Sequence, residues 1–464
     1  MTSPPRRSFL KSGAAALGAS LLPGRSRAAG RPRVGIVGGG LAGVSCAWLL
    51  DGAADAVLFE SRSALGGHAH TIPVVAGGHE ILVDVGAQFF ARGPHPTYTR
   101  LLEHLGLLDA GAPEHDATLD VEMTITVTRA GEANPRFVSP SRDRVWPVFA
   151  PWNRAALAAF LVFTRAAERL SRDGDWDLPL GSWLDGLRLP AAQREGLLLP
   201  LLAAMVGCTT EQARALSARG AVLFIAKALP EKLLDPVLYG NSLLGLQGNV
   251  ERVAAECHGL TTHAGVAVSA VSRRFGGGFR IHAAGGLVED VDRVVFATPP
   301  QMTAALLGDL PLLARAARVL GEFEYFTAEV SIHRDPVYMP AAPRHWSAYN
   351  AHVDGVHAEG SVWYGALRPV PAGDEPLSLF KSWATARAQP PQDEIVRRAF
   401  RHPLVTPAFL RLQERLARFQ GRAGVYFAGS YTREVDSQET ALVSAMDVVR
   451  AIAPFAPNLA ALEG

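Results

Sequence analysis

The first residues whose types and spacing could do chemistry are six positions near the N-terminus. They have the G-x-G-x-x-G pattern and read Gly38-Gly39-Gly40-Leu41-Ala42-Gly43. In this pattern the first glycine permits a tight turn, the second lets the backbone approach a pyrophosphate, and the third lets a helix pack closely on a strand. The unpaired N–H groups of that helix would then face the phosphates. The spacing therefore indicates a dinucleotide site.

The flanking segments are those that must position these glycines. An apolar run, Val34–Val37, predicts a strand before them, and Val44–Leu50 predicts a buried helix after them. A second predicted strand, Ala56–Phe59, leads into Glu60, about 20 residues further on, where a carboxylate accepts hydrogen bonds from ribose hydroxyls. This order predicts a Rossmann-like βαβ unit but leaves NAD and FAD both open.

The residues that follow Glu60 carry a resemblance that favours FAD. Glu60-Ser61-Arg62-Ser63-Ala64-Leu65-Gly66-Gly67-His68 resembles a segment of the flavin-containing amine oxidase and phytoene desaturase superfamily, and Val83–Phe89 resembles its D-x-G segment. The resemblance implies that Glu60 and Ser61 lie at the adenosine ribose and that Arg62 lies near the adenosine and phosphates. It also implies that Gly66 and Gly67 pass close to the flavin. His68 stands where relatives often have another basic residue.

Two later segments resemble further parts of the same cofactor domain. The first has a predicted helix from Leu246 to Glu256, a β run at Val266–Val271, glycine turns, and a predicted strand at Val291–Phe296. The resemblance places the backbone of Val268 at the adenine. It also places the tip Ala297-Thr298-Pro299-Pro300 beside the cofactor.

The last segment runs from an apolar strand at Gly424–Ser430 into a helix that begins near Asp436. Asp436 and Glu439 have capping-box spacing. The resemblance implies that Gly429 and Ser430 lie at the ribityl chain, with Ser430 in the place of a common acid. It further implies that the N-terminus of the helix, at Thr440 and Ala441, faces the flavin N1–C2=O edge. No cysteine lies near this motif, where monoamine oxidases attach their flavin, so non-covalent FAD is expected.

The spacing of these segments predicts an α/β fold with a Rossmann-like FAD-binding domain, three-layered and glutathione-reductase-like, and a discontinuous α+β substrate domain. The cofactor domain is expected to comprise residues 31–100, 241–305 and 416–455. The substrate domain is expected to comprise a helical part, 101–240, and a mixed part, 306–415. Helical patterns at 155–163 and 196–206, and strand patterns at 328–332 and 362–364, support this division.

The N-terminus has the features of an export signal. Arg6-Arg7-Ser8-Phe9-Leu10-Lys11 precedes a weakly apolar run, and Ser26-Arg27-Ala28 suits cleavage after Ala28. We therefore expect residues 1–28 to be a twin-arginine signal, read by the Tat translocase, that sends the protein to the periplasm or another extracytoplasmic place. Removing the five basic residues of this segment changes the net charge from +1 to −4.

The composition excludes several classes of protein. In a chain of 464 residues, 48% are hydrophobic and 19% are charged, which is typical of a globular protein, and the charge balance gives no reason to expect nucleic acid. We expect no membrane span in the mature chain. The three cysteines are too few and too scattered for a disulfide framework or a zinc site, so no metal is expected.

The substrate side is less sharply defined. Several segments, among them Gly67–Thr71, Ile332–Asp335, Trp346–Asn350 and Arg401–Pro403, resemble a bacterial group of predicted NAD(P)/FAD-dependent oxidoreductases. No serine–histidine–acid set or carboxylate pair competes with flavin chemistry. The candidates to face a small-molecule substrate are His68, His70, Trp363, Tyr364, Lys381 and Tyr431. For each of them, a purely structural role is the alternative to substrate contact.

Three functions follow as hypotheses. The first is an exported FAD-dependent oxidoreductase that transfers a hydride from a small molecule, with apolar and acyl-chain compounds among the candidates, to flavin N5 and passes electrons to oxygen or a quinone. The second is an amine oxidase that produces hydrogen peroxide. The third is a flavin-bound binding or assembly protein of the cell envelope that has no turnover.

Overall fold

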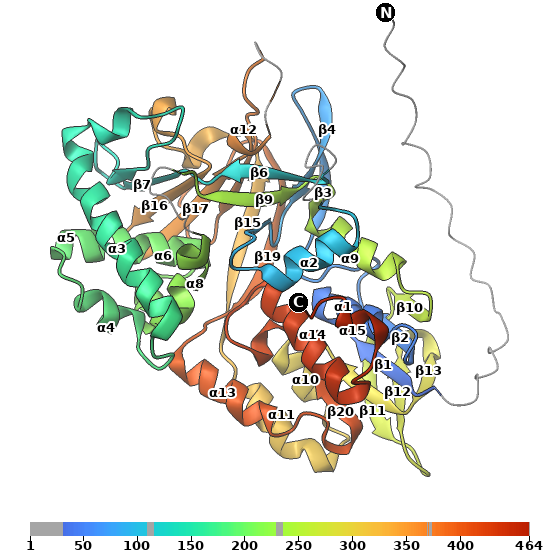
Figure 1. Cartoon of the computed structure of the whole chain (residues 1–464). Helices are drawn as coiled ribbons and strands as arrows, with labels where there is room; N and C mark the ends of the chain where they lie inside the picture. The colour runs from blue at the N-terminus through green and yellow to red at the C-terminus, as the bar shows by residue number, and fades with distance from the viewer. Residues whose placement is uncertain (1–30, 109–115, 229–234, 369, 371–373, 464) are drawn as a thin grey trace, which may run out of the picture. The chain divides into compact units, whose positions relative to one another are not determined.

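A five-stranded parallel sheet carries the glycine motif in the computed structural model of the chain, which describes residues 31–108, 116–228, 235–368, 370 and 374–463. The predicted signal segment, 1–28, lies outside the described residues. In spatial order the strands are β10 (Leu260–Ala264), β2 (Asp55–Glu60), β1 (Arg33–Val37), β14 (Arg293–Phe296) and β20 (Val425–Phe427). Figure 1 shows how blue, yellow and red parts of the chain meet here.

One layer on each side covers this sheet, which explains why its central strands are apolar on both faces. On one face α1 (Leu41–Leu50), α9 (Gly245–Ala255) and α14 (Gln438–Ile452) share a core with Val34 and Ile36. On the other face β11 (Val268–Arg273), β12 (Phe279–Ala283) and β13 (Val288–Val291) form an antiparallel sheet that shares a core with Val37. The three layers confirm the predicted fold of the cofactor domain.

The capping of α14 differs from the prediction by one residue. The side chain of Ser437 accepts a hydrogen bond from the Thr440 N–H, and the side chain of Thr440 completes the capping box. Asp436 and Glu439, the predicted pair, do not form the capping box and make other hydrogen bonds instead. The Glu439 carboxylate accepts hydrogen bonds at 3.0 and 2.8 Å from two N–H groups in the first turn of α2 (Pro96–His104) and so joins the two helices.

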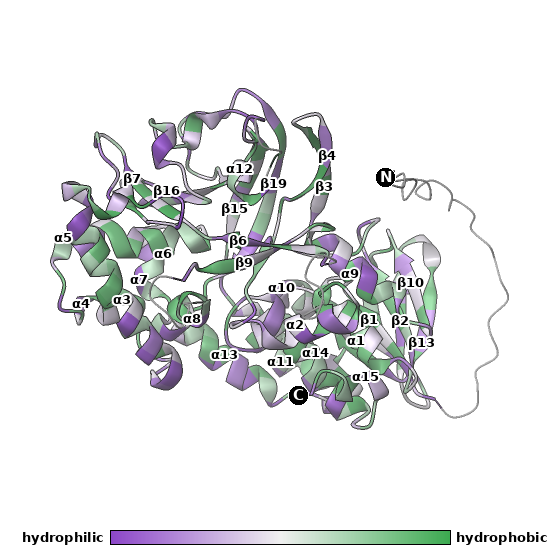
Figure 2. Ribbon diagram, turned by 45° about the horizontal axis from the view of Figure 1, so that its top comes forward, coloured by the Kyte–Doolittle hydropathy of each residue, from purple (hydrophilic) through white to green (hydrophobic). Residues whose placement is uncertain are grey.

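All strands of a seven-stranded mixed sheet come from the expected substrate domain. Its order is β19 (Glu394–Pro403), β15 (Tyr325–His333), β18 (Phe380–Trp383), β17 (His357–Trp363), β16 (Tyr349–Asp354), β7 (Ile125–Arg129) and β8 (Phe137–Val138). The helices that share a core with it are α3 (Arg154–Asp173), α4 (Leu180–Asp185), α6 (Leu199–Val206), α7 (Thr210–Ala215) and α8 (Ala218–Ala228). Figure 2 shows that α3 carries both hydrophobic and hydrophilic residues, as a helix with one buried side must.

Smaller elements connect these two sheets. A hairpin of β3 (Thr71–Ala76) and β4 (His79–Asp84) and a three-stranded sheet of β5 (Phe89–Phe90), β9 (Leu238–Ser242) and β6 (Thr118–Glu122) lie in the chain between them. The remaining α-helices are α5 (Ala191–Gln193), α10 (Pro300–Leu306), α11 (Ala314–Gly321), α12 (Tyr364–Leu367), α13 (Pro407–Ala417) and α15 (Pro457–Ala460). Within the described ranges, no helix is long and apolar enough to cross a membrane.

Several element predictions need correction. The strand expected at 291–296 is two strands, because the Asp292 carboxylate accepts a hydrogen bond of 2.7 Å from the Arg33 N–H and turns the chain between two sheets. The interval 101–240, expected to be helical, also contributes β6, β7 and β8. The helix expected at 196–206 begins earlier, as a π-helix at Arg194–Leu198. The strand expected at 362–364 ends at Trp363.

A buried ion pair fixes the loop between β18 and β19. Arg387 Nε lies 3.2 Å from Glu359 Oε2, and each side chain is 8% exposed. The other oxygen of Glu359 accepts hydrogen bonds from the N–H groups of Thr385 and Ala386 at 2.7 and 3.0 Å. The carboxylate therefore holds both the loop backbone and the guanidinium.

We expect Glu359→Gln to lower the free energy of unfolding by about 3 kcal/mol, because it leaves the Arg387 charge buried without a counter-charge. Urea denaturation measures this change. As a control, Asp177→Asn removes an ion pair with Arg411 in which both side chains are 57% exposed, and should cost less than about 1 kcal/mol. Equal losses in the two variants would contradict the structural role of Glu359.

Candidate functional site

The residues predicted to bind a cofactor meet at the carboxyl edge of the five-stranded sheet. Because the strands are parallel, the loops that follow β1, β2, β14 and β20 all leave the sheet at this edge. These loops carry Gly38–Gly40, the segment after Glu60, Ala297 and Gly429. Val268 is the first residue of β11, which follows β10 in the chain. Open α/β sheets bind their ligands in this position.

The glycine motif has the local geometry that phosphate binding requires. Gly38 has φ +113°, and Gly40 is the N-cap of α1, so Leu41 and Ala42 form the first turn of the helix. A Cβ atom on Gly43 would lie 1.9 Å from the carbonyl oxygen of Gly38, which no side chain permits. The first turn of α1 can therefore come directly against the turn after β1, with its N–H groups directed at the edge.

Glu60 is held in place by the backbone around it. Its carboxylate accepts hydrogen bonds from the Gly39 N–H at 2.8 Å and from the Arg62 N–H at 2.9 Å, and Ser61 Oγ donates to it at 3.2 Å. Two carboxylate oxygens offer about four acceptor positions. Glu60 can thus organise the glycine turn and still accept hydrogen bonds from a ribose.

The loop of the glycine pair lies directly on the glycine motif. The Gly66 N–H donates to the Gly39 carbonyl at 2.9 Å, and the Arg62 guanidinium donates to the Gly67 carbonyl at 2.8 Å. A Cβ on Gly67 would lie 3.0 Å from the Gly40 Cα. The two glycine-rich loops form one continuous backbone surface at the edge of the sheet.

The D-x-G segment packs beneath that surface. The Asp84 carboxylate accepts hydrogen bonds from Thr71 Oγ1 at 2.6 Å and from the Leu246 N–H at 2.9 Å. Burial raises the pKa of Asp84 to about 6, while these hydrogen bonds and Lys381 lower it. A Cβ on Gly86 would lie 1.9 Å from the His68 carbonyl oxygen, so the glycine lets this segment support the loop that carries His68.

The loop after β20 has Ser430 in the position where the sequence resemblance leads us to expect an acid, and a carboxylate from another residue lies beside it. The Gly429 N–H donates to Ser444 Oγ on α14 at 2.8 Å. Ser430, which stands where relatives often have an acid, donates its hydroxyl to Asp436 Oδ1. Thr440 is buried in the first turn of α14, and Ala441 is half-buried beside it. A carboxylate is therefore present at this position of the fold, although it comes from six residues further along the chain.

These features fit an FAD molecule. Two buried ring nitrogens close to the edge, Nε2 of His70 and Nε2 of His402, have no hydrogen-bond partner among the described residues. These two nitrogens are therefore free to form a hydrogen bond with a bound molecule. The backbone surface, the Glu60 carboxylate, the Arg62 guanidinium and the N-terminus of α14 could hold the ribose, the phosphates and the flavin. Direct contact of each residue with FAD stays a prediction.

Lys381 and His68 both lie next to Gly86, where the cofactor segment meets the substrate domain. The Lys381 ammonium on β18 donates to the Gly86 carbonyl. Burial lowers the pKa of Lys381 to about 8, against an opposing effect of Asp84. His68 is exposed, and its ring stacks on that of His402, with centroids 5.6 Å apart and an interplanar angle of 21°.

His402 is a functional candidate that the sequence motifs did not identify individually. It lies on β19, and its ring also contacts Trp383 and Phe326, at centroid distances of 5.4 and 5.8 Å. Arg398, Phe400 and His402 alternate along β19, and side chains that alternate along a strand lie on the same face. This alternation is the one sequence signal that relates His402 to its neighbours. We call His68, Phe326, Trp383, Phe400 and His402 the aromatic box.

The other substrate-side candidates lie elsewhere. Tyr364 is 1% exposed in the core, and its hydroxyl accepts a hydrogen bond of 2.9 Å from Gln88 Nε2. Tyr431 is 4% exposed and packs edge-on against Phe323 beneath the five-stranded sheet. Trp363 Nε1 donates to the Leu377 carbonyl at 2.9 Å. The structure thus places His68 and Lys381 next to the same residue, Gly86, and buries both tyrosines.

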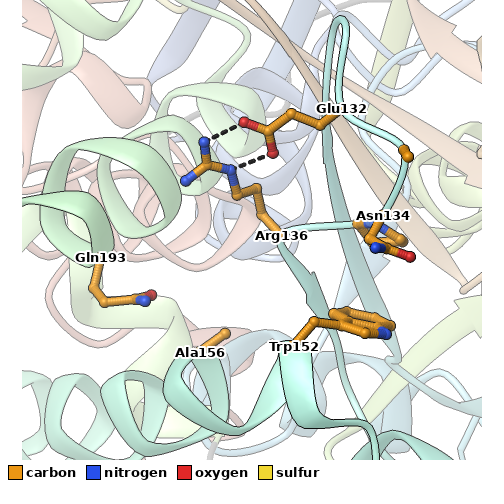
Figure 3. A pocket seen from close by; sticks show the side chains of 8 residues that line it. Glu132, Asn134, Arg136, Trp152, Ala156 and Gln193 are labelled. Carbon is orange, nitrogen blue, oxygen red and sulfur yellow. Dashed lines mark hydrogen bonds and ion pairs between the residues drawn. The ribbon is translucent and has the colours of Figure 1, made fainter.

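Two cavities lie outside the cofactor edge. The one in Figure 3, of about 370 Å³, is lined by Arg136, Trp152 and Gln193 among others and contains no motif residue. The Arg136 guanidinium in this lining forms an ion pair with Glu132. The second, of about 350 Å³, includes Phe326 and Arg401 in its lining. Because Phe326 also belongs to the aromatic box, the second cavity adjoins the substrate side of the site.

Comparison with known proteins supports a Rossmann-like fold for the N-terminal part. Residues 36–105 match the family model of an NAD(P)-binding Rossmann-like domain. A stretch of 103 residues, 22% of this chain, is 33% identical to tryptophan 2-monooxygenase of Allorhizobium ampelinum. That stretch spans only 14% of the relative's length.

Solved structures match nearly the whole chain. Cyclohexylamine oxidase from Brevibacterium oxydans has a TM-score of 0.64 at 15% identity, over 92% of this chain and 99% of that one. A putrescine oxidase bound to putrescine has a TM-score of 0.63 at 17% identity, over 91% and 99%. This chain has the amine-oxidase fold. A CLA-producing fatty acid isomerase from P. acnes shares the fold, with a TM-score of 0.64 at 14% identity over 91% and 99%, so the amine-oxidase fold is not restricted to amines.

We expect Glu60→Gln to weaken the binding of FAD by about tenfold or more, because a neutral amide is a poorer acceptor for ribose hydroxyls and for the Gly39 N–H. Fluorescence titration of deflavinated protein with FAD measures the affinity. Glu103→Gln, at an exposed position of α2, is the matched control. Unchanged affinity in Glu60→Gln would exclude Glu60 from cofactor binding.

A second prediction concerns Lys381, whose pKa falls from 10.5 to about 8 on folding. Between these values the unfolded chain binds more protons than the folded one, so this residue makes the free energy of unfolding rise with pH across that window. Lys381→Met should remove this rise and be at least as stable as the wild type at pH 7. Urea denaturation from pH 7 to 10 tests it.

The control for this experiment is Lys227→Met, which replaces an exposed lysine on α8. Its curve should parallel that of the wild type. If the Lys381→Met curve also runs parallel, Lys381 does not titrate in the way its burial indicates.

Proposed function

We propose that this protein binds FAD non-covalently at the carboxyl edge of its five-stranded sheet and oxidises a small molecule. The observation that carries the proposal is the meeting of the glycine motif, Glu60, the glycine pair and the N-terminus of α14 at one edge, next to buried nitrogens without partners. When bound there, FAD would supply a ring that accepts a hydride from a C–H bond of the substrate.

The cofactor side of the site supplies binding and electrostatic stabilisation. Glu60 accepts hydrogen bonds from the ribose, and the first turn of α1 offers its N–H groups to the phosphates. Ser430, in contact with Asp436, replaces the common acid at the ribityl chain. The N-terminus of α14 places its positive dipole end where negative charge develops on reduction.

The substrate side supplies orientation and a dry environment. The aromatic box lies next to the glycine-pair loop and consists of the packed rings of Phe326, Trp383, Phe400 and two histidines. Apolar surroundings exclude water from the reacting atoms. Lys381, the nearest buried cation, disfavours a second positive charge beside it. These features favour an apolar or acyl-chain substrate over a cationic amine.

Amine oxidation with hydrogen peroxide as product is the second candidate. The solved structures that share the fold include a cyclohexylamine oxidase and a putrescine oxidase, and this likeness favours the candidate. A flavin-bound envelope protein without turnover remains the third hypothesis. We further propose export through the Tat pathway, based on Arg6 and Arg7, with oxygen or a quinone as electron acceptor.

The test is anaerobic bleaching of the flavin in the purified protein against a set of amines and a set of acyl lipids. We expect a yellow protein with one releasable FAD whose absorbance is bleached by members of the acyl set. A colourless protein without FAD would overturn the proposal. Bleaching by amines alone, with peroxide formed in air, would establish the second candidate.

Gly43→Val is the matched negative variant for this test. A side chain at this position would collide with the Gly38 carbonyl, so the turn that receives the phosphates cannot form. Preparations of this variant should contain no FAD and show no bleaching with any substrate. Gly106→Val, at a glycine with open space around its Cβ position but φ +67°, controls for the general cost of losing a glycine.

A further inference from the structure

Two imidazole rings from distant parts of the chain are stacked at the proposed flavin site. His68 comes from the loop that contains Gly66 and Gly67, and His402 comes from the end of β19. Their centroids are 5.6 Å apart, and the planes differ by 21°. This geometry keeps the rings in contact across the boundary between the cofactor segment and the seven-stranded sheet.

Aromatic side chains surround the His402 ring, but one of its nitrogens has no hydrogen-bond partner among the described residues. Phe326, Trp383 and Phe400 surround its ring at centroid distances of 5.8, 5.4 and 6.4 Å. Its Nε2 is buried and has no hydrogen-bond partner among the described residues. A nitrogen in this state can accept a proton or a hydrogen bond from a molecule that enters the box.

The charges that face His402 come from three further elements. His68 on the glycine-pair loop and Lys381 on β18 lower its pKa, and Asp436 before α14 raises it. Burial is the largest cause and brings the pKa to about 4, so the ring is neutral at pH 7. Asp436 is the one acid in this set, and it also accepts the hydrogen bond from Ser430.

We propose that the His68–His402 pair is the proton acceptor of the site, and that Asp436 stabilises the imidazolium that forms. This inference rests on the proposed oxidation. The substrate loses a hydride to FAD and a proton to Nε2 of His402. A C–H bond and a neighbouring C–H, N–H or O–H bond break, a double bond forms in the substrate, and an N–H bond forms on the imidazole.

The arrangement explains why a carboxylate is needed near the buried ring. A single buried imidazolium would be costly in an apolar box. The stacked ring of His68 is exposed, which leaves one side of the pair open to water, and Asp436 lies close enough to favour the charged form of His402. In this scheme His402 is a catalytic residue and Asp436 is a positioning residue.

The test does not require the substrate. In the FAD-loaded protein, reduction places negative charge beside the pair, which should then take up a proton. We therefore expect the midpoint potential of the bound flavin, measured by dye equilibration, to fall more steeply with pH in the wild type than in His402→Asn over about pH 5–8. The steeper slope corresponds to one additional proton taken up per reduction.

Matched variants sharpen the result. His79→Asn replaces an exposed histidine on β4 and should keep the wild-type slope. Asp436→Asn should keep the additional proton but shift its uptake to lower pH by about one unit or more, because the opposing charge is lost. His402→Gln serves as the second variant if His402→Asn loses FAD.

Each result separates the two proposals. A wild-type protein without FAD overturns the proposed function and this inference with it. A wild-type protein with FAD whose slope equals that of His402→Asn and His402→Gln overturns the inference alone. A slope lost in both His402 variants and kept in His79→Asn supports it.

Discussion

Backbone packed directly on backbone is the constraint on which the rest of the structure depends. At the carboxyl edge of the five-stranded sheet, Gly43 meets the Gly38 carbonyl and Gly86 meets the His68 carbonyl at distances that leave no room for a Cβ atom. Side chains could not replace these contacts, because any carbon at those positions would separate the loops by more than an ångström. The edge is therefore a surface of peptide groups, which is what a phosphate- and flavin-bearing ligand requires.

The surrounding fold serves to bring four separated stretches of chain to this edge. Asp84 joins β3 and α9 through Thr71 and the Leu246 N–H, and Glu439 joins α14 to α2 through the N–H groups of Thr97 and Tyr98. Both carboxylates act on backbone donors at helix starts, where unpaired N–H groups are available. The N–H groups that α1 offers to an anion in the proposed site thus have counterparts that hold the domain together elsewhere.

The fold of the cofactor segments could be predicted from the sequence because its requirements are local. Gly38, Gly40, Gly43 and Glu60 lie within one βαβ unit, so their spacing alone indicates how they meet. The three-layer fold followed from the order of the segments. The capping of α14 was placed one residue too early, because Asp436 and Ser437 can both cap a helix. Only the fold shows that Asp436 is already engaged by Ser430.

The substrate side could be predicted only in part, as His68 and Lys381, because its residues meet only in the tertiary structure. His402 and Trp383 lie on different strands, and no spacing in the chain relates them to His68. Tyr364 was a reasonable candidate from its residue type, yet it is 1% exposed beside Gln88. The break at Asp292 depends on a hydrogen bond to Arg33, which is 259 residues away.

The position of β20 has a consequence for how the protein matures. This strand, Val425–Phe427, pairs with β14, and the helix that follows it packs on α1 near the beginning of the chain. The ribosome must therefore synthesise the chain as far as residue 427 before the sheet has its final edge. A nascent chain that stalls before residue 425 would therefore leave the β14 edge of the sheet and the side of α1 that packs on α14 uncovered.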